Sequence, residues 1–227
     1  MTIESGCAEF FQILLEQPHV PAALFRERLP PELFALLADV PPELVDTGRE
    51  GERRPLGEVV FRLALLGGGE VFVCCLLEHR APTPPVAVRA LSALVRTWQW
   101  LARDRRQGAL PVVVPLVVYH GPTPWTAGRT FSSLSHAPLG GGQLLDFELI
   151  LVDLGAIEDG ELSQLPVLKV GLLALKHATR GGGSWGDSLR RLSEVGVDHA
   201  FLLEQIEGAF PGHAAQLSRW LGAPSRA

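Results

Sequence analysis

Apolar residues recur at helical spacing near the start of the chain. They are Phe10, Phe11, Leu14, Leu15, Leu24 and Phe25. This spacing predicts an amphipathic helix from Glu9 to about Arg28, interrupted near Gln17-Pro18 because proline cannot continue a helical hydrogen-bond ladder. A further helical turn or two is expected at Glu32–Leu37. The segment from Pro41 to Pro55 is polar and rich in turn-forming residues, which predicts a surface loop.

Two β-rich runs joined by glycines come next. Glu58–Leu66 (EVVFRLALL) and Glu70–His79 (EVFVCCLLEH) flank Gly67-Gly68-Gly69, and this arrangement predicts a β-hairpin. The second run is almost continuously apolar, a pattern that is typical of a central strand buried on both faces.

A long helix is predicted from about Val86 to Arg106. Its expected apolar face consists of Ala87, Leu91, Leu94, Val95, Trp98 and Leu101. Arg89, Arg96 and Arg103 repeat every seven residues on what the pattern places as the opposite side, so we expect a solvated basic stripe there. The same stripe also suits contacts with a phosphate backbone.

Two further apolar runs complete the predicted sheet. Leu110–Tyr119 (LPVVVPLVVY) is of strand length, with Pro115 indicating a bulge or an edge at that point, and Phe147–Leu154 (FELILVDL) is another strand. Since a helix joins two buried strands, the order indicates a βαβ crossover. The predicted fold class is therefore α/β with a mixed central sheet flanked by helices.

The character of the chain changes after about residue 156. Helical patterns cover Glu161–Ala178, Leu189–Val195 and Ala200–Leu221. Pro166 and Gly171 weaken the first of these. The patterns predict a core domain at 1–155 and a helical C-terminal extension at 156–227 that packs on it.

Composition and charge exclude several classes of protein. The 227 residues carry a net charge of −5, which excludes a uniformly basic nucleic-acid coat but not a local basic patch. No apolar stretch reaches the roughly 18 residues of a membrane span, and the N-terminus lacks the pattern of a signal peptide. We therefore expect a soluble, cytoplasmic protein without a membrane partner.

The three cysteines favour buried free thiols over a disulfide or a metal site. Cys74 and Cys75 are adjacent in a strand-like run, so their side chains point to opposite faces, and Cys7 stands alone. No Cys-x-x-Cys or Cys/His ligand spacing occurs.

The predicted hairpin brings together the residues best suited to chemistry. Glu58 opens its first strand, Glu78 ends the second, and Arg80 follows two residues later, on the same side as Glu78 if the strand continues. Two carboxylates and a cation suit phosphodiester hydrolysis, because Mg²⁺ prefers carboxylate oxygens and activates a bound water. The alternative is structural, with Glu58 at a strand start and Glu78 and Arg80 forming a surface ion pair.

Other polar residues carry weaker signals. His120 follows a strand and suits either a hydrogen bond to a phosphate or a role in capping its loop. His79 is expected on the face opposite to Glu78, as a core or interface histidine, and Trp125 is expected to anchor its loop by packing. The serines near His136 lack the G-x-S-x-G context of a serine hydrolase.

Several segments resemble the recombination-promoting nuclease family, the bacterial YhgA-like transposase group. The similar segments are Phe10–Ala38, Leu76–Arg80 (LLEHR), a helix that holds Arg89, Leu110–Trp125 (LPVVVPLVVYHGPTPW) and Phe147–Leu154. The resemblance covers roughly residues 7–160. It implies a restriction-endonuclease-like core of the PD-(D/E)xK type, DNA as a partner, and Mg²⁺ held by Glu58 and Glu78. In that case Glu58, Glu78 and Arg80 are the catalytic residues, and Arg89, Arg96, Arg103 and His120 are expected to contact DNA.

The sequence departs from the family pattern at several of its functional positions. Cys7-Ala8 replaces a His-Asp pair, Phe11-Gln12 replaces Phe-Lys, and Glu58 replaces an aspartate. Glu78 matches the family glutamate, whereas Arg80 stands in place of a glutamine, and arginine cannot act as a base near neutral pH. Two hypotheses follow. The chain is a Mg²⁺-dependent DNA endonuclease with a partly degraded active site, or it is an inactive relative that binds DNA or a protein partner.

Overall fold

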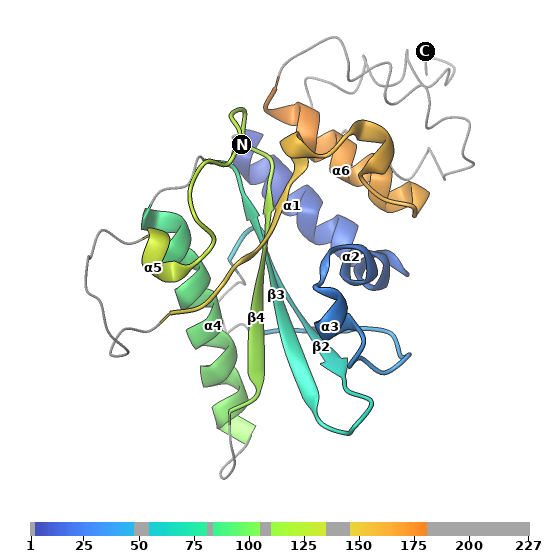
Figure 1. Ribbon diagram of the computed structural model, residues 1–227, viewed down its shortest axis with the longest axis vertical. Helices are drawn as coiled ribbons and strands as arrows, with labels where there is room; N and C mark the ends of the chain where they lie inside the picture. Colours follow the sequence, from blue (N-terminus) through green and yellow to red (C-terminus); the bar gives the residue numbers. More distant parts are fainter. Residues whose placement is uncertain (1–2, 48–54, 81–83, 105–109, 135–145, 181–227) are drawn as a thin grey trace.

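The computed structural model shows a five-stranded sheet with helices on both faces (Figure 1). The structure describes residues 3–47, 55–80, 84–104, 110–134 and 146–180. The strands lie in the order β1-β2-β3-β4-β5; the first two pairings are antiparallel and the last two are parallel. The mixed α/β class predicted from the sequence is therefore confirmed.

Three helices form the N-terminal segment, interrupted where the sequence predicted. They are α1 (Ile3–Leu15), α2 (Val20–Arg28) and α3 (Pro31–Phe34). Between α1 and α2, Pro18 is followed by His19 in the left-handed conformation, with φ 66°, and this turn changes the direction of the chain. Leu29 is extended before Pro30, as expected of a residue that precedes proline, so α2 ends there.

The predicted hairpin forms the middle of the sheet. Strands β2 (Glu58–Ala64) and β3 (Glu70–Glu78) pair antiparallel, and Gly68 and Gly69 between them have positive φ angles. The segment from Pro41 to Pro55 was predicted to be only a loop, and this prediction is wrong in part. It contains β1 (Glu43–Val45), a three-residue strand that pairs with β2.

The crossover between β3 and β4 confirms the predicted βαβ unit. Helix α4 (Pro84–Asp104) joins β3 to β4 (Val112–Tyr119), which runs parallel to it. The helix begins at Pro84. Proline is tolerated at this position because the amide groups of the first helical turn have no intrahelical carbonyl to bind. On one side of β4, Pro115 is paired with β3. On the other side, β5 (Ile150–Asp153) pairs with β4 only from Leu116 onward, so no described strand flanks Pro115 there. The predicted edge at Pro115 is therefore confirmed.

Short elements lead into the last described helix. They are α5 (Phe131–Leu134), η1 (Leu154–Ala156), η2 (Asp159–Glu161) and α6 (Pro166–Ala178). Pro166 was predicted to weaken a helix that begins at residue 161; instead it occupies the first turn and starts the helix. The helices predicted at Leu189–Val195 and Ala200–Leu221 lie outside the described residues.

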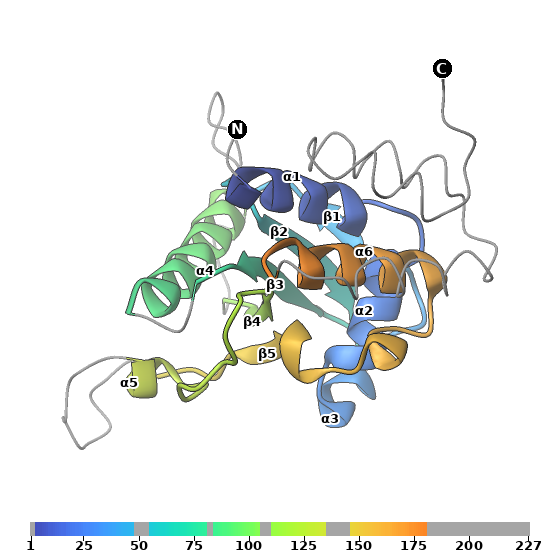
Figure 2. The same ribbon diagram turned by 90° about the horizontal axis from the view of Figure 1, so that it is seen from above.

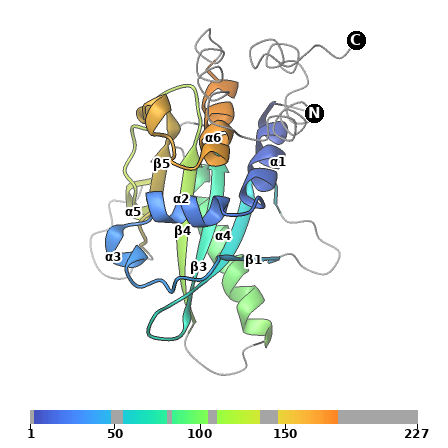
Figure 3. The ribbon, with the colours of Figure 1, turned by 90° about the vertical axis from the view of Figure 1, so that its right-hand side faces the viewer.

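Helices lie on both faces of the sheet (Figure 2), which separates two apolar clusters of side chains. One cluster contains side chains of α1, α2 and α6 packed on one face, and the other contains α4 on the opposite face. Figure 3 shows α1, α2 and α6 together in front of the strands, with α4 behind them. Helix α6 thus shares the first cluster with α1 and α2, while the predicted domain division near residue 155 stays a prediction. Within the described residues, no helix is long and apolar enough to cross a membrane.

The apolar face of α4 differs from the predicted one at several positions, and Leu91, predicted on that face, is only partly buried. Val95 was placed on the buried face, but its side chain is exposed, as is that of Val88. Ala87 is buried as predicted, and the buried side of the helix also includes Ala90 and Ala93, which the prediction omitted. Small side chains let a helix lie close to a sheet, so longer neighbours on the helix can reach the strands.

Candidate functional site

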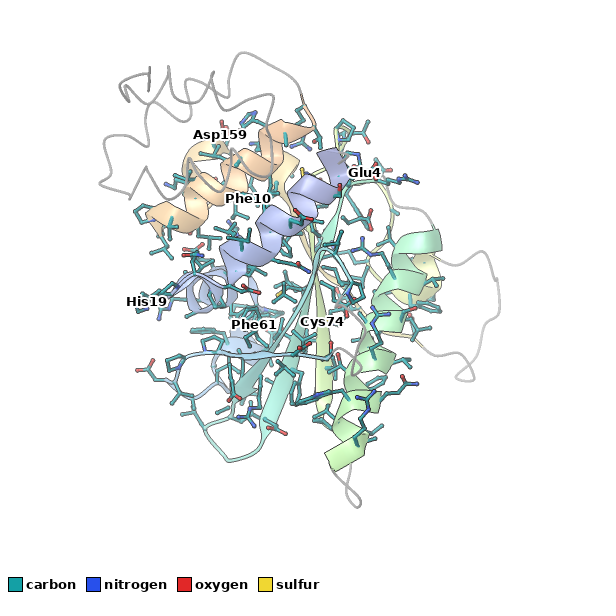
Figure 4. The ribbon with its side chains drawn as sticks, turned by 180° about the vertical axis from the view of Figure 1, so that it is seen from behind. Glu4, Phe10, His19, Phe61, Cys74 and Asp159 are labelled. Atoms are coloured by element: carbon teal, nitrogen blue, oxygen red, sulfur yellow. The ribbon has the colours of Figure 1, made fainter. Side chains whose placement is uncertain are left out.

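The two predicted carboxylates lie on the same face of the sheet. In the β2–β3 register Glu58 is opposite Leu76, and Glu78 is two residues further along β3, so the two glutamates are diagonal neighbours facing α4. Cys74, labelled in Figure 4, precedes Leu76 on this same face. The prediction that the hairpin brings Glu58 beside Glu78 is confirmed.

Glu58 is fully enclosed and is paired with an arginine of α4. Its side chain is 1 % exposed. Arg96 donates to both of its carboxylate oxygens, from Nε to Oε1 at 3.3 Å and from Nη2 to Oε2. A carboxylate this deeply buried requires a countercharge, and the bidentate guanidinium supplies it.

Glu78 ends β3 with both oxygens engaged as well. Oε1 accepts the backbone N–H groups of His79 and Arg80, each at 3.0 Å, and Oε2 accepts Arg89 Nη1 at 3.0 Å. The same Arg89 nitrogen donates to the carbonyl of Leu77 at 2.9 Å. Arg89 therefore fixes the end of β3 to α4.

These contacts correct the predicted solvated stripe on α4 for two of its three members. Arg89 and Arg96 reach the sheet and pair with Glu78 and Glu58, because the buried carboxylates require positive partners. Arg103 is exposed, as expected. The expected contacts of all three arginines with DNA stay predictions.

Arg80 does not join the two carboxylates through its side chain. Strand β3 has ended at Glu78, so the alternation that would place Arg80 beside it no longer applies. The Arg80 guanidinium is 74 % exposed, and Nη2 lies 3.7 Å from a carboxylate oxygen of Glu4 in α1. Figure 4 labels Glu4 at the start of α1. Glu4 is far from Arg80 in the sequence, so no local pattern predicted that the two residues pair.

An open cavity of about 630 Å³ lies where β3 ends and α1 begins. Its lining includes Glu4, Glu78, His79, Arg80, Arg89 and His120. Glu58 is not part of this lining, so only one of the two predicted metal ligands reaches the cavity. Crevices beyond the carboxyl ends of parallel strands are a common place for ligands in α/β proteins.

His120 is a buried, neutral imidazole. Its Nδ1 lies 3.1 Å from the carbonyl oxygen of Leu175, which can only accept, so Nδ1 carries the hydrogen. Burial is the main cause that lowers the pKa of His120 from 6.5 to about 4; the hydrogen bond to Leu175 opposes this shift, and the nearby His79 and Arg180 add to it. In the neutral ring Nε2 is left as an acceptor, which does not suit the predicted hydrogen bond to a phosphate oxygen.

His79 lies beside His120 and lines the same cavity as Glu78, so the prediction that it faces away from Glu78 is not confirmed. The two ring centroids are 5.3 Å apart, and His79 Nε2 is 3.2 Å from Glu4. Trp125 behaves as predicted, since its ring packs against Tyr119 with 5.3 Å between centroids. Its backbone N–H donates to Asp153 at 3.0 Å, which ties this loop to the end of β5.

The turn after β4 depends on a glycine. A Cβ at Gly121 would lie 2.2 Å from the Tyr119 hydroxyl and 2.5 Å from the backbone oxygen of His79. The tyrosine is itself held, because its hydroxyl donates to the carbonyl of Thr123 at 2.7 Å. Arg180 from the end of α6 donates to the carbonyl of Gly121 at 2.6 Å.

The Gly121→Ala substitution is therefore expected to destabilise the fold by about 1–3 kcal/mol, since neither the backbone oxygen nor the buried ring can move freely. Chemical denaturation of the variant measures this loss. Gly67→Ala is the matched control, because nothing lies within 4 Å of a Cβ at Gly67. Equal stability of both variants and the wild type would contradict the crowding described here.

The cysteines are free and buried, as predicted. Burial raises the pKa of the Cys7 thiol to about 12, and burial with the nearby Glu58 carboxylate raises that of Cys74. All three thiols are thus protonated at neutral pH and are unsuited to act as nucleophiles or metal ligands.

The acidic pair does not fit a Mg²⁺ site in this arrangement. Mg²⁺ needs carboxylate oxygens that are free to enter an octahedral shell, whereas the oxygens of Glu58 and Glu78 all accept hydrogen bonds. Two of these donors are guanidinium cations, which repel a further positive ion. Among the residues that the structure describes, no group of three His, Cys, Asp or Glu side chains is placed to hold a metal.

These features define a mixed α/β protein with an acidic pair, countered by arginines, at one end of the interior strands β2 and β3. The chain belongs to the family described as putative transposase, YhgA-like, whose family model matches residues 8–195. The match confirms the resemblance seen in the sequence and extends it past residue 160. No curated protein and no solved structure matches the chain.

Proposed function

We propose that this protein is a non-cleaving member of its family, a restriction-endonuclease-like scaffold of the PD-(D/E)xK type that binds DNA without metal-dependent hydrolysis. One observation carries the proposal. Every carboxylate oxygen of Glu58 and Glu78 accepts a hydrogen bond, and an arginine of α4 is a partner of each residue.

The positions of the arginines explain why hydrolysis is not expected. Arg89 Nη1 lies 3.0 Å from Glu78 Oε2 and occupies an oxygen that a metal ion would need as a ligand. An arginine cannot lose its proton near neutral pH, so it cannot activate water. The two arginines thus neutralise the buried carboxylates of Glu58 and Glu78. None of these four side chains is then suited to activate a water molecule as a nucleophile.

Binding of DNA is supported by two exposed arginines, one at the cavity and one near the far end of α4. Arg80 lines the cavity with a guanidinium that is 74 % exposed, and Arg103 lies exposed near the end of α4. Guanidinium groups bind phosphate oxygens in a bidentate fashion. Because the chain as a whole carries a charge of −5, we expect only a few phosphate contacts and weak binding.

The first test is cleavage of a supercoiled plasmid by the purified protein in Mg²⁺, Mn²⁺ or EDTA. We expect no more nicking by the wild type than by Glu78→Gln in any of these buffers. The nearly isosteric Gln keeps the shape of the site, so folding is not the variable. Nicking that needs the metal and is absent from Glu78→Gln would overturn the proposal and establish the second candidate function, a metal-dependent endonuclease.

That second candidate has one observation in its favour. Glu78 and Arg89 both line the cavity, so a substrate phosphate that attracts Arg89 would uncover one oxygen of Glu78. The plasmid must therefore be present in the assay, because metal binding by the free protein does not test a site assembled by the substrate.

DNA binding is tested by titrating a labelled duplex at several salt concentrations. We expect Arg80→Ala to weaken binding several-fold and to reduce the slope of log K against log salt by about 1, the amount for one lost phosphate contact. Arg26→Ala is the control, because Arg26 is exposed on α2 and lines a different hollow. Equal binding by wild type and Arg80→Ala, or no binding at low salt, would contradict this assignment.

A further inference from the structure

We propose that the Glu4 carboxylate occupies the anion-binding position of Arg80 in the cavity, so that a DNA phosphate has to displace Glu4 in order to bind there. Glu4 is thus an internal competitor that lowers the affinity of this site for DNA. The inference rests on the proposed function, because it assumes that Arg80 contacts a phosphate. It adds a residue of α1 to a site that the sequence pattern confined to the hairpin and the residues after it.

The start of α1 lies against the ends of β2 and β3. A Cβ atom at Gly57, just before β2, would lie 3.4 Å from the Cβ atoms of both Ala8 and Leu77, so the first turns of the helix pack directly on these strand ends. Glu4 stands in the first turn of α1 and lines the same cavity as Arg80. Figure 4 shows Glu4 at this end of the helix.

The two carboxylate oxygens of Glu4 face two different donors. Oε1 lies 3.2 Å from His79 Nε2, and Oε2 lies 3.7 Å from Arg80 Nη2. A guanidinium group binds carboxylates and phosphates with the same N–H donors. The carboxylate therefore takes a position at Arg80 that suits a phosphate oxygen, and His79 holds it there.

The contact between Glu4 and Arg80 is weak enough to be displaced. The side chain of Glu4 is 48 % exposed, and the distance of 3.7 Å to Arg80 is longer than a normal hydrogen bond. Exposed ion pairs of this kind contribute little to stability, because water hydrates both partners and holding two long side chains in place costs entropy. Glu4 can therefore turn into solvent when an anion arrives, without loss of the fold.

The charges of the described lining explain why the position of Glu4 matters. The lining contains two carboxylates, those of Glu4 and Glu78, and two guanidinium groups, those of Arg80 and Arg89. Glu78 is already matched by Arg89. With Glu4 against Arg80, the formal charges of these four groups cancel. With Glu4 withdrawn, the positive charge of Arg80 is left uncompensated, and this second arrangement attracts an anion.

The test is the dissociation constant of the purified protein for a labelled DNA duplex at low salt. Glu4→Gln keeps the size of the side chain and removes its charge. We expect this variant to bind roughly three- to five-fold more tightly than the wild type, the factor that corresponds to the upper range for an exposed ion pair.

Glu9→Gln is the matched control for the change in net charge. Glu9 is exposed on the same helix and is not part of the cavity lining. It lies five residues after Glu4, which places it about 140° around the helix from Glu4. We expect Glu9→Gln to bind DNA almost as the wild type does.

A double variant with Arg80→Ala separates competition from a structural role of Glu4. An acidic residue in the first turn also stabilises a helix through its dipole, and that effect does not depend on Arg80. If Glu4 competes for Arg80, the gain from Glu4→Gln falls to that of the control once Arg80 is replaced. Thermal unfolding of each variant confirms that binding is compared among folded proteins.

Three results would overturn the inference. The first is equal binding by wild type, Glu4→Gln and Glu9→Gln while Arg80→Ala binds more weakly, and this result leaves the proposed function intact. The second is the same gain from Glu4→Gln with and without Arg80, which also leaves it intact. The third is no binding by wild type and Glu4→Gln alike, which overturns the proposed DNA binding together with the inference.

Discussion

Replacing Arg96 with alanine is expected to destabilise the protein by about 3 kcal/mol, more than any other change in the charged network. The substitution leaves the Glu58 carboxyl group 1 % exposed, with no other described partner. Breaking a buried ion pair at one partner costs about 3–5 kcal/mol. We expect the lower end, because Arg96 is 35 % exposed and water can enter the space it leaves.

The comparison with Arg89→Ala makes this prediction specific. Glu78 keeps two backbone N–H donors when Arg89 is removed, so we expect a loss of about 1–2 kcal/mol there. Urea denaturation of both variants measures the difference. Adding Glu58→Gln to Arg96→Ala should recover much of the lost stability, since no unpaired buried charge then remains at this position. Equal losses for Arg89→Ala and Arg96→Ala would contradict the described pairing.

Acidification is expected to destabilise the fold through His120. The pKa of this imidazole is about 4 in the folded protein, chiefly because of burial, against 6.5 for a solvated histidine in the unfolded chain. Above pH 6.5 both states are neutral and His120 contributes no pH dependence. As the pH falls from 6.5 towards 4, only the unfolded chain takes up the proton. Stability is lost progressively, by about 3 kcal/mol in all.

The measurement is the free energy of unfolding of wild type and His120→Asn between these two pH values. The asparagine amide can replace the Nδ1 donor to Leu175 and does not titrate. His177, whose pKa burial also lowers, and the carboxylates titrate in both proteins, so the difference between the two curves reports His120 alone. Parallel curves would show that His120 is accessible to protons in the folded state.

The sequence predicts most of the sheet because the relevant signals are local. The hairpin follows from two apolar runs around Gly67-Gly68-Gly69, and the crossover follows from a helical pattern between two buried runs. Strand β1 was missed because three residues after Pro41-Pro42 give no alternating pattern. Helix α6 was started five residues early, because proline in a helical pattern was interpreted as a disruption instead of a first turn.

In the candidate site, only the placement of the two glutamates was predictable from the sequence. Strand alternation and hairpin register place Glu58 and Glu78 on one face, and the structure agrees. The partners were not predictable from the helical pattern, which assigned Arg89 and Arg96 to solvent because charged residues normally face it. One available signal was the set of alanines at 87, 90 and 93, which lets α4 approach the sheet closely enough for the arginines to reach it.

The most direct test of the central claim is a titration of the wild-type protein with Mn²⁺, followed by the electron paramagnetic resonance signal of the free ion. If Arg89 and Arg96 occupy the carboxylates as described, the wild type takes up no Mn²⁺ at millimolar concentration beyond the amount taken up by Glu78→Gln. Saturable binding of one ion per chain that is lost in Glu78→Gln would show that the arginines leave the acidic pair, and would contradict this account.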